Sequence, residues 1–158
     1  MFPSFMTLFF SPINFDENYD LFLHYRKSAH LELEGAEEIK EEVVKDYIRN
    51  NLKNFGELAF QHILLSNNKI IGQIEIGTKS NYGYVYFFYL EPSYRGKGFF
   101  KQMHKQMVEI MQKKGFNTVM LSTPRSNKKA IEIYQKYGWR ITGVNKKKEG
   151  ILDLRLEL

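Results

Sequence analysis

The spacing of hydrophobic residues switches along the chain between the period of a helix and the period of a strand. The predicted strands span residues 6–10, 58–65, 70–76, 84–90, 118–122, 139–144 and 151–156. The predicted helices span residues 16–30, 37–52, 99–114 and 127–137, with Asp16 and either Ser126 or Asn127 placed as helix caps. Because no repeat or linker interrupts this order, the pattern favours one α/β domain over residues 1–158.

The segment Tyr84–Leu90 differs from the other strands because every residue in it is apolar or aromatic. Such a run predicts a strand that is buried on both faces and therefore lies in the middle of a sheet. A glycine-containing loop, a helix and a further strand follow. The order strand, loop, helix, strand predicts two parallel strands joined by a right-handed crossover.

Composition narrows the possible chemistry. The chain of 158 residues is long enough for one sizeable core. It contains no cysteine, which excludes disulfides and cysteine-ligated metal sites and fits a cytoplasmic location. Its four histidines form no HxxxH or HxH pair, so no metal site is predicted. No apolar run approaches the ~20 residues that span a bilayer, and the N-terminus lacks the features of a signal peptide.

A net charge of +5 fits a nucleic-acid, membrane or phosphorylated-cofactor partner, or simply a basic surface. We expect no membrane partner. We also expect no nucleic-acid partner, because no predicted helix concentrates Lys and Arg beside base-reading polar groups.

The loop after Leu90 carries the first candidate site. It contains Gly96 and Gly98 and opens a helix, whose first turn has unpaired N–H groups and a positive dipole end. Glycines allow a ligand to approach the backbone closely, so the loop predicts a phosphate site, with Arg95 placed to brace it. Taken alone, the same pattern also fits a tight turn before a helix.

The second candidate element runs from Asn127 to Trp139. Ala130, Tyr134 and Tyr137 share one face of its predicted helix. Taken alone, Tyr134 is better interpreted as a core tyrosine whose hydroxyl is satisfied, because buried tyrosines are common.

Together the two elements resemble a known family. The segment Leu-Glu-Pro-Ser-Tyr-Arg-Gly-Lys-Gly, which ends at Gly98, resembles the acetyl-CoA pyrophosphate loop of GNAT acyltransferases, Arg/Gln-x-x-Gly-x-Gly/Ala. Asn127-x-x-Ala130-x-x-x-Tyr134-x-x-x-Gly138-Trp139 resembles the same family's later motif, Asn-x-x-Ala-x-x-x-Tyr-x-x-x-Gly-Phe. The resemblance implies a GNAT fold of class α/β (α+β), with a mixed sheet of six or seven strands. It also implies helices on both faces and a splayed central strand pair that leaves a cleft.

The resemblance further implies acetyl-CoA as co-substrate and a role for each matching position. Residues whose main chain or side chain would contact the cofactor are Phe88, Tyr89, Leu90, Gly96, Lys97, Gly98, Phe99, Phe100, Lys101 and Asn127. Tyr134 would be the general acid that returns a proton to the leaving thiolate, and the Leu90 amide would stabilise the oxyanion. Phe100 departs from the family pattern, which has Gly or Ala there, so its side chain must turn into the core.

These roles predict an N-acetyltransferase that moves an acetyl group from acetyl-CoA to a primary amine by direct attack in a ternary complex. The acceptor would be a small-molecule amine, or an N-terminal or lysine amine of a protein. The alternative is a catalytically silent GNAT-fold module that binds acyl-CoA or a protein. A homodimer and the use of other acyl groups are left open.

The sequence leaves the general base open. Glu75 and His24 are candidates, as is direct attack by an already neutral amine with water removing the proton. The resemblance assigns the acceptor pocket to the first two helices and their loop, which offer Tyr19, His24, Tyr25, Glu32 and Glu34.

Overall fold

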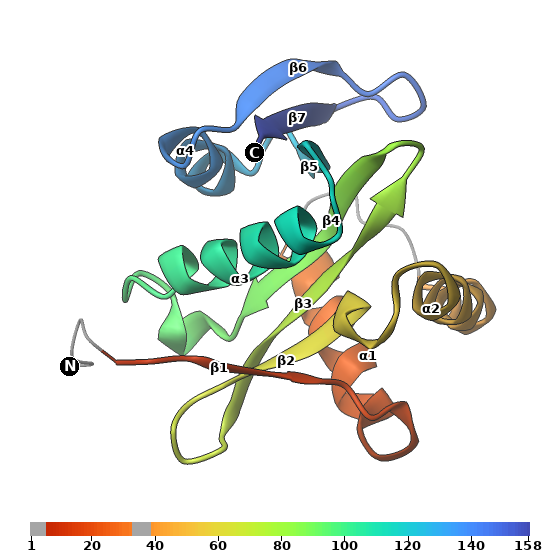
Figure 1. Ribbon diagram of the computed structural model, residues 1–158, viewed down its shortest axis with the longest axis vertical. Coiled ribbons are helices and arrows are strands. Elements are labelled where there is room, and N and C mark those ends of the chain that lie inside the picture. Colours follow the sequence, from red (N-terminus) through yellow and green to blue (C-terminus); the bar gives the residue numbers. More distant parts are fainter. Residues whose placement is uncertain (1–5, 33–38) are drawn as a thin grey trace.

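The computed structural model describes residues 6–32 and 39–158, and in that part of the chain seven strands form one mixed sheet (Figure 1). The strand order is β1-β2-β3-β4-β5-β7-β6. The strands are β1 (Phe9–Pro12), β2 (Phe60–Leu64), β3 (Ile70–Lys79), β4 (Tyr82–Leu90), β5 (Thr118–Pro124), β6 (Arg140–Val144) and β7 (Ile151–Glu157). The helices are α1 (Phe15–Leu31), α2 (Glu41–Phe55), α3 (Phe100–Lys113) and α4 (Lys128–Lys136). The predicted mixed α/β sheet is confirmed.

Helices cover both faces of the sheet, as predicted (Figure 1). On one face, Arg26 of α1 and Tyr47 of α2 both bond to Glu75 of β3. On the opposite face, α3 lies so close to β4 that a Cβ on Gly83 would meet the Met111 sulfur at 2.6 Å. The glycine at position 83 is therefore required for α3 to pack against the sheet.

The two central strands separate soon after they meet. β4 pairs in parallel with β5 only at Gly83↔Val119 and Tyr84↔Met120, whereas its antiparallel pairing with β3 continues to Leu90. The strands therefore diverge beyond Tyr84, which confirms the predicted splayed central pair.

A bulge lies next to this point of divergence. The β3–β4 register shifts between Glu75 and Ile76, which pair with Phe87 and Val85 and leave Tyr86 as the extra residue on β4. A bulge re-aims the side chains beside it. Tyr86 packs against Tyr47 of α2 and Phe87 lies under Arg26 of α1, so two consecutive aromatic rings face the same side of the sheet.

The prediction that β4 is buried on both faces is wrong. Val85 and Tyr89 are buried, but four of the strand's aromatic side chains are only half-buried: Tyr84, Tyr86, Phe87 and Phe88. The strand does lie in the middle of the sheet. Because β5 leaves it after Tyr84, the far half of β4 has a neighbouring strand on one side only, which leaves Tyr86, Phe87 and Phe88 partly uncovered.

Several element ends also differ from the prediction. α1 begins at Phe15 because Asn14, rather than Asp16, is its cap: Asn14 Oδ1 accepts a hydrogen bond from the Asp16 amide at 3.0 Å. β1 begins at Phe9 because its register is set by pairing with β2, from Phe9↔Leu64 onward. α2 begins at Glu41; of its predicted earlier turn, residues 37–38 lie outside the described residues. No helix of the described chain is long and apolar enough to cross a membrane.

Two histidines are buried in neutral surroundings. His104 Nε2 accepts a hydrogen bond from Trp139 Nε1 at 2.9 Å, and burial lowers the pKa of His104. Burial also lowers the pKa of His62, whose two ring nitrogens have no hydrogen-bond partner among the described residues. Both rings are therefore held without charge in the folded protein.

This arrangement makes the free energy of unfolding depend on pH. The folded-state pKa of both rings lies below the unfolded value of about 6.5, so the unfolded chain binds more protons as the pH falls through that value. We expect full stability above about pH 6.5 and a decline between there and about pH 5. Urea unfolding at a series of pH values measures this decline, which should be shallower in His62→Phe. A free energy of unfolding that stays constant from about pH 8 to about pH 5 would contradict the prediction.

Candidate active site

The glycine loop joins the end of β4 to the start of α3. After Leu90 the chain makes a short 3-10 turn, and Gly96 and Gly98 then adopt positive φ angles of 72° and 84°. A Cβ at either glycine would meet no atom within 4 Å, so the backbone conformation, rather than crowding, requires glycine. No side chain caps the start of α3, which leaves its first-turn amides without that kind of partner.

Arg95 braces this loop. Its Nε donates to the Leu90 carbonyl at 2.8 Å, and its two terminal nitrogens bond to the Glu32 carboxylate at 3.0 Å each. Its guanidinium also lies 5.1 Å from the centre of the Tyr89 ring. Glu32, a predicted acceptor-pocket residue, is therefore engaged in holding the loop to the end of α1.

The second motif meets the first in space. The Tyr134 ring on α4 lies 5.8 Å from the Phe100 ring at the first turn of α3. Burial raises the pKa of Tyr134 to about 12. Phe100 packs among four rings, as expected for a side chain that joins the apolar interior; its neighbours are Phe88, His104, Tyr134 and Tyr137.

The other predicted cofactor residues lie in the loop, in the first turn of α3 or at the start of α4. Asn127 occupies the cap position of α4 but makes no side-chain cap bond, and its Nδ2 donates to Thr123 Oγ1 at 3.4 Å. The Phe99 side chain is buried in the core, while Lys97 and Lys101 are exposed. No group of His, Asp and Glu side chains in the described chain could hold a metal ion.

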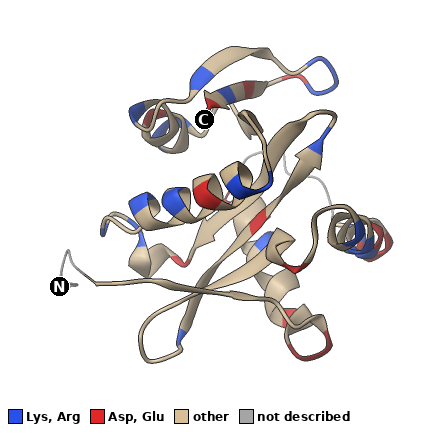
Figure 2. Ribbon diagram, in the orientation of Figure 1, with Lys and Arg blue, Asp and Glu red and all other residues tan. Residues whose placement is uncertain are grey.

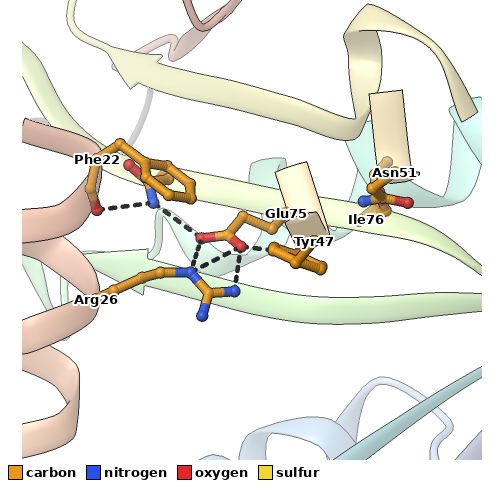
Figure 3. Close-up of polar contacts among 7 residues, drawn as sticks. Phe22, Arg26, Tyr47, Asn51, Glu75 and Ile76 are labelled. Carbon is orange, nitrogen blue, oxygen red and sulfur yellow. Dashed lines mark hydrogen bonds and ion pairs between the residues drawn. The ribbon is translucent and has the colours of Figure 1, made fainter. Parts of the chain in front are cut away.

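Glu75 is the centre of a buried network (Figure 3). Its carboxylate is fully buried and accepts hydrogen bonds from Arg26 Nε at 3.1 Å and from the Tyr47 hydroxyl at 2.9 Å. Gln73 Nε2 donates to its other oxygen at 2.9 Å. Burial and the Glu75 charge raise the pKa of Tyr47, and Glu75 raises the pKa of Arg26 against the effect of burial. Glu75 is thus committed to an ion pair, which removes it as a candidate general base.

The remaining residues suggested for the acceptor side do not converge on one point. His24 is exposed on α1, and its ring contacts Tyr25 at 6.0 Å. The Tyr25 hydroxyl donates to Glu91, and burial raises its pKa. The Tyr19 hydroxyl is buried without a partner among the described residues, and Glu34 lies outside them.

The sequence analysis missed a polar chain that crosses three strands. The Tyr84 hydroxyl donates to Ser122 Oγ at 2.9 Å, and Ser122 Oγ donates to Asp153 Oδ1 at 2.7 Å. Asn145 Nδ2 also donates to Asp153 Oδ1, at 3.0 Å. The partners are 38 and 31 residues apart in the sequence, so no local pattern links them.

Positive charge gathers along α3 and α4 and at the β6–β7 hairpin, while acidic residues lie at the start of α1 and on α2 (Figure 2). A surface cavity of about 380 Å³ lies at this hairpin. Its lining residues are Lys79, Thr142, Gly143, Val144, Asn145, Lys146, Lys147 and Asp153.

A mixed sheet whose central parallel strands diverge beside a glycine loop defines the chain as a GNAT-type α/β protein. The model of the Acetyltransferase (GNAT) family matches residues 16–139, and the chain belongs to this family. Comparison with curated proteins finds no match.

Solved structures show the same fold. A GNAT-family acetyltransferase from Staphylococcus aureus Mu50 superposes with a TM-score of 0.76 at 12% identity, over 96% of this chain and 99% of that one. The PaiA N-acetyltransferase of Thermoplasma acidophilum, solved with coenzyme A, has a TM-score of 0.68 at 21% identity, over 97% of this chain and 100% of that one. A third structure, solved with acetyl coenzyme A, is a protein of Bacillus anthracis Ames that is named as a candidate streptothricin acetyltransferase. Its TM-score is 0.56 at 25% identity. That match spans 63% of this chain and 62% of the other.

The Glu75 network makes a stability prediction. Arg26→Met leaves a buried carboxylate without its cation, and we expect the free energy of unfolding to fall by about 3–5 kcal/mol. The double variant Arg26→Met with Glu75→Leu removes both charges and should recover most of that loss. Chemical denaturation measures both.

The matched control is Arg49→Met, because Arg49 pairs with Asp46 on the surface with 73% and 67% of the side chains exposed. The free energy of unfolding of Arg49→Met should fall by less than about 1 kcal/mol. An equally small loss for Arg26→Met would show that Glu75 does not depend on this ion pair.

Proposed function

We propose that this protein transfers an acetyl group from acetyl-CoA to a primary amine, which attacks the thioester directly in a ternary complex. The observation that carries the proposal is the contact between Tyr134 of α4 and Phe100 of α3, with ring centres 5.8 Å apart. That contact brings together a phosphate-type loop and a candidate proton donor from distant parts of the sequence, within a fold whose family consists of acetyltransferases.

The loop supports the cofactor part of the proposal. The amides of Gly96, Lys97, Gly98, Phe99, Phe100 and Lys101 hold the pyrophosphate at the positive end of α3, and Lys97 and Lys101 add charge. Asn127 contacts the cofactor arm. These roles suit the open space around both glycines.

The main chain of β4 holds the pantetheine arm beyond the point where β5 leaves. Successive residues of a strand direct their N–H and C=O groups to opposite edges. A Cβ on Gly72 would meet the Tyr89 carbonyl at 2.1 Å, so the main-chain groups of Tyr89 face β3. Of the three β4 residues expected to contact the cofactor, we therefore assign that contact to Phe88 and Leu90 and not to Tyr89. Arg95 occupies the Leu90 carbonyl. Of the two amides that face the cofactor, the Phe88 amide lies nearer to the point where the strands part, so it serves as the oxyanion donor in place of the Leu90 amide expected from the sequence.

Tyr134 acts as the general acid. When the amine attacks the carbonyl carbon, the bond to sulfur breaks and a thiolate leaves, which needs a proton. The raised pKa of Tyr134, about 12, keeps its phenol protonated at neutral pH, so it can donate that proton.

The acceptor is tested by a screen for thiol release from acetyl-CoA. The panel follows the named activities of similar structures, which include a candidate streptothricin acetyltransferase and a ribosomal-protein-S18-alanine N-acetyltransferase from Escherichia coli. It contains streptothricin, spermidine, kanamycin and peptides that begin with alanine or contain lysine. Acetyl-CoA binding without thiol release from any of these would favour the silent binding module instead.

Gly98→Val tests the cofactor loop. A β-branched residue at a φ of 84° costs about 1–2 kcal/mol, so the loop shifts and we expect acetyl-CoA affinity to fall by roughly tenfold or more. Calorimetry measures the affinity. Gly143→Val is the matched control, because Gly143 on β6 also has open space around it but has no positive φ. Equal affinities for the parent and Gly98→Val would count against the pyrophosphate assignment.

Tyr134→Phe tests the general acid. The substitution keeps the ring packing against Phe100 and removes only the hydroxyl, so thermal stability and cofactor affinity should barely change. Turnover with an acceptor from the screen should fall by roughly 10² or more. The control is Tyr137→Phe, which removes a hydroxyl from the C-cap residue of the same helix and from the same aromatic cluster. Full activity in Tyr134→Phe would assign the proton to water or to CoA itself.

A further inference from the structure

The proposed reaction needs a group that takes a proton from the acceptor nitrogen. After attack the nitrogen carries one proton too many, and the amide product forms only when that proton leaves. Glu75 is committed to Arg26, and His24 is an exposed side chain on α1. The chain formed by Tyr84, Ser122 and Asp153 is a third arrangement of hydroxyls and a carboxylate, and it lies where the two central strands part.

The direction of hydrogen bonding in this chain follows from counting protons. An ionised carboxylate only accepts, so the single hydroxyl proton of Ser122 must point to Asp153, 2.7 Å away. Ser122 then has no proton left for Tyr84, and the Tyr84 hydroxyl must donate to it. The Tyr84 oxygen is consequently left as an acceptor, available to an N–H group from outside the chain.

The position of Tyr84 suits an acceptor amine. Tyr84 is the last residue of β4 that pairs with β5. Its ring lies 4.7 Å from Tyr86, which packs against α2, so it belongs to the face covered by α1 and α2. The cofactor loop and Tyr134 belong to α3 and α4 on the opposite face. A cofactor held from one side and an amine arriving from the other would meet where the strands part.

We propose that Tyr84, Ser122 and Asp153 form a proton relay that orients the acceptor nitrogen and takes its excess proton. This inference rests on the proposed function. In the relay step, the N–H bond of the tetrahedral adduct breaks and its proton bonds to the Tyr84 oxygen. The Tyr84 proton moves to Ser122 and the Ser122 proton to Asp153, which becomes a neutral carboxylic acid. The hydroxyl oxygens of Tyr84 and Ser122 each gain one proton and lose one. The nitrogen loses one proton and Asp153 gains one, so the step balances.

The surroundings of the two end groups agree with this assignment. Burial raises the pKa of Tyr84, so its phenol stays protonated and passes a proton along rather than acting as the base itself. Asp153 is half-buried and, among the described residues, no cation lies within ion-pair distance of it, in contrast to Glu75. Lys79 lies over the Tyr84 ring at 4.8 Å, and it lines the same cavity as Asp153, together with Lys146 and Lys147.

Turnover of three single variants tests the relay. Tyr84→Phe, Ser122→Ala and Asp153→Asn each interrupt it at a different point while they keep the size of the side chain nearly constant. We expect thiol release from acetyl-CoA to slow by roughly 10² in each variant, both with n-butylamine as the acceptor and with water as the acceptor. Because one break disables the whole chain, the double variants should be no slower than the slowest single variant.

Glu157→Gln is the matched control. Glu157 lies on β7, as Asp153 does. Its carboxylate also accepts a hydrogen bond from a hydroxyl of β5, in this case that of Thr118, and the substitution removes that carboxylate. We expect it to leave the rate unchanged. Losses that multiply in the double variants, or an equal loss in Glu157→Gln, would overturn the relay and indicate general structural damage, which thermal melts of every variant would also reveal.

A binding experiment tests the orienting role without turnover. S-(2-aminoethyl)-CoA places a nitrogen just beyond the sulfur, and S-ethyl-CoA has a similar shape without it. We expect the parent to bind the amino compound roughly tenfold more tightly, the value of one added hydrogen bond to the Tyr84 oxygen. Tyr84→Phe should lose this preference and keep its affinity for S-ethyl-CoA.

The outcomes separate the two proposals. If neither CoA thioether binds the parent, the proposed function fails and the relay fails with it. If both bind equally well and the three relay variants keep their rates, the relay is wrong and the proposed acetyltransferase function stands.

Discussion

The separation of β4 from β5 after only two residue pairs is the constraint on which the rest of the site depends. A strand in the middle of a sheet normally has both edges paired, and main-chain groups left without partners cost free energy when they are buried. Beyond Tyr84, β4 keeps its partner β3 on one side and loses β5 on the other. The exposed edge suits an extended ligand arm, and the glycine loop at the end of the same strand suits the phosphates that such an arm would carry.

The divergence also explains the aromatic side chains of β4. A bulge at Tyr86 turns two consecutive rings toward α1 and α2, where they stay half-buried beside the edge that β5 leaves open. On the other face, Phe88 packs against Phe100 of α3 and so links the strand to the cofactor loop. The same strand therefore presents different chemistry to its two faces: apolar packing toward α3, and phenol hydroxyls toward the side on which we place the acceptor.

Two carboxylates of the sheet differ in burial and in pairing. Glu75 is fully buried and accepts hydrogen bonds from Arg26, Tyr47 and Gln73, so its charge is compensated and it holds α1 and α2 to β3. Asp153 is half-buried and receives hydrogen bonds from Ser122 and Asn145, with no described cation in ion-pair distance. A charge paired with a cation stabilises a fixed arrangement, whereas Asp153 is held by hydrogen bonds from neutral groups. This difference is why we assign structure to Glu75 and chemistry to Asp153.

The sequence by itself determined the order of strands and helices, the mixed sheet and the family, because hydrophobic periodicity and the two motifs around Gly98 and Tyr134 are local signals. It misjudged the burial of β4 and proposed Glu75 as a base, because both depend on which distant residues come to lie alongside. Only the tertiary structure decided that Arg26 pairs with Glu75, and that Tyr84, Ser122 and Asp153 line up across three strands. Such contacts are set by strand register and helix packing, which join residues far apart in the chain and leave no periodic trace in the sequence.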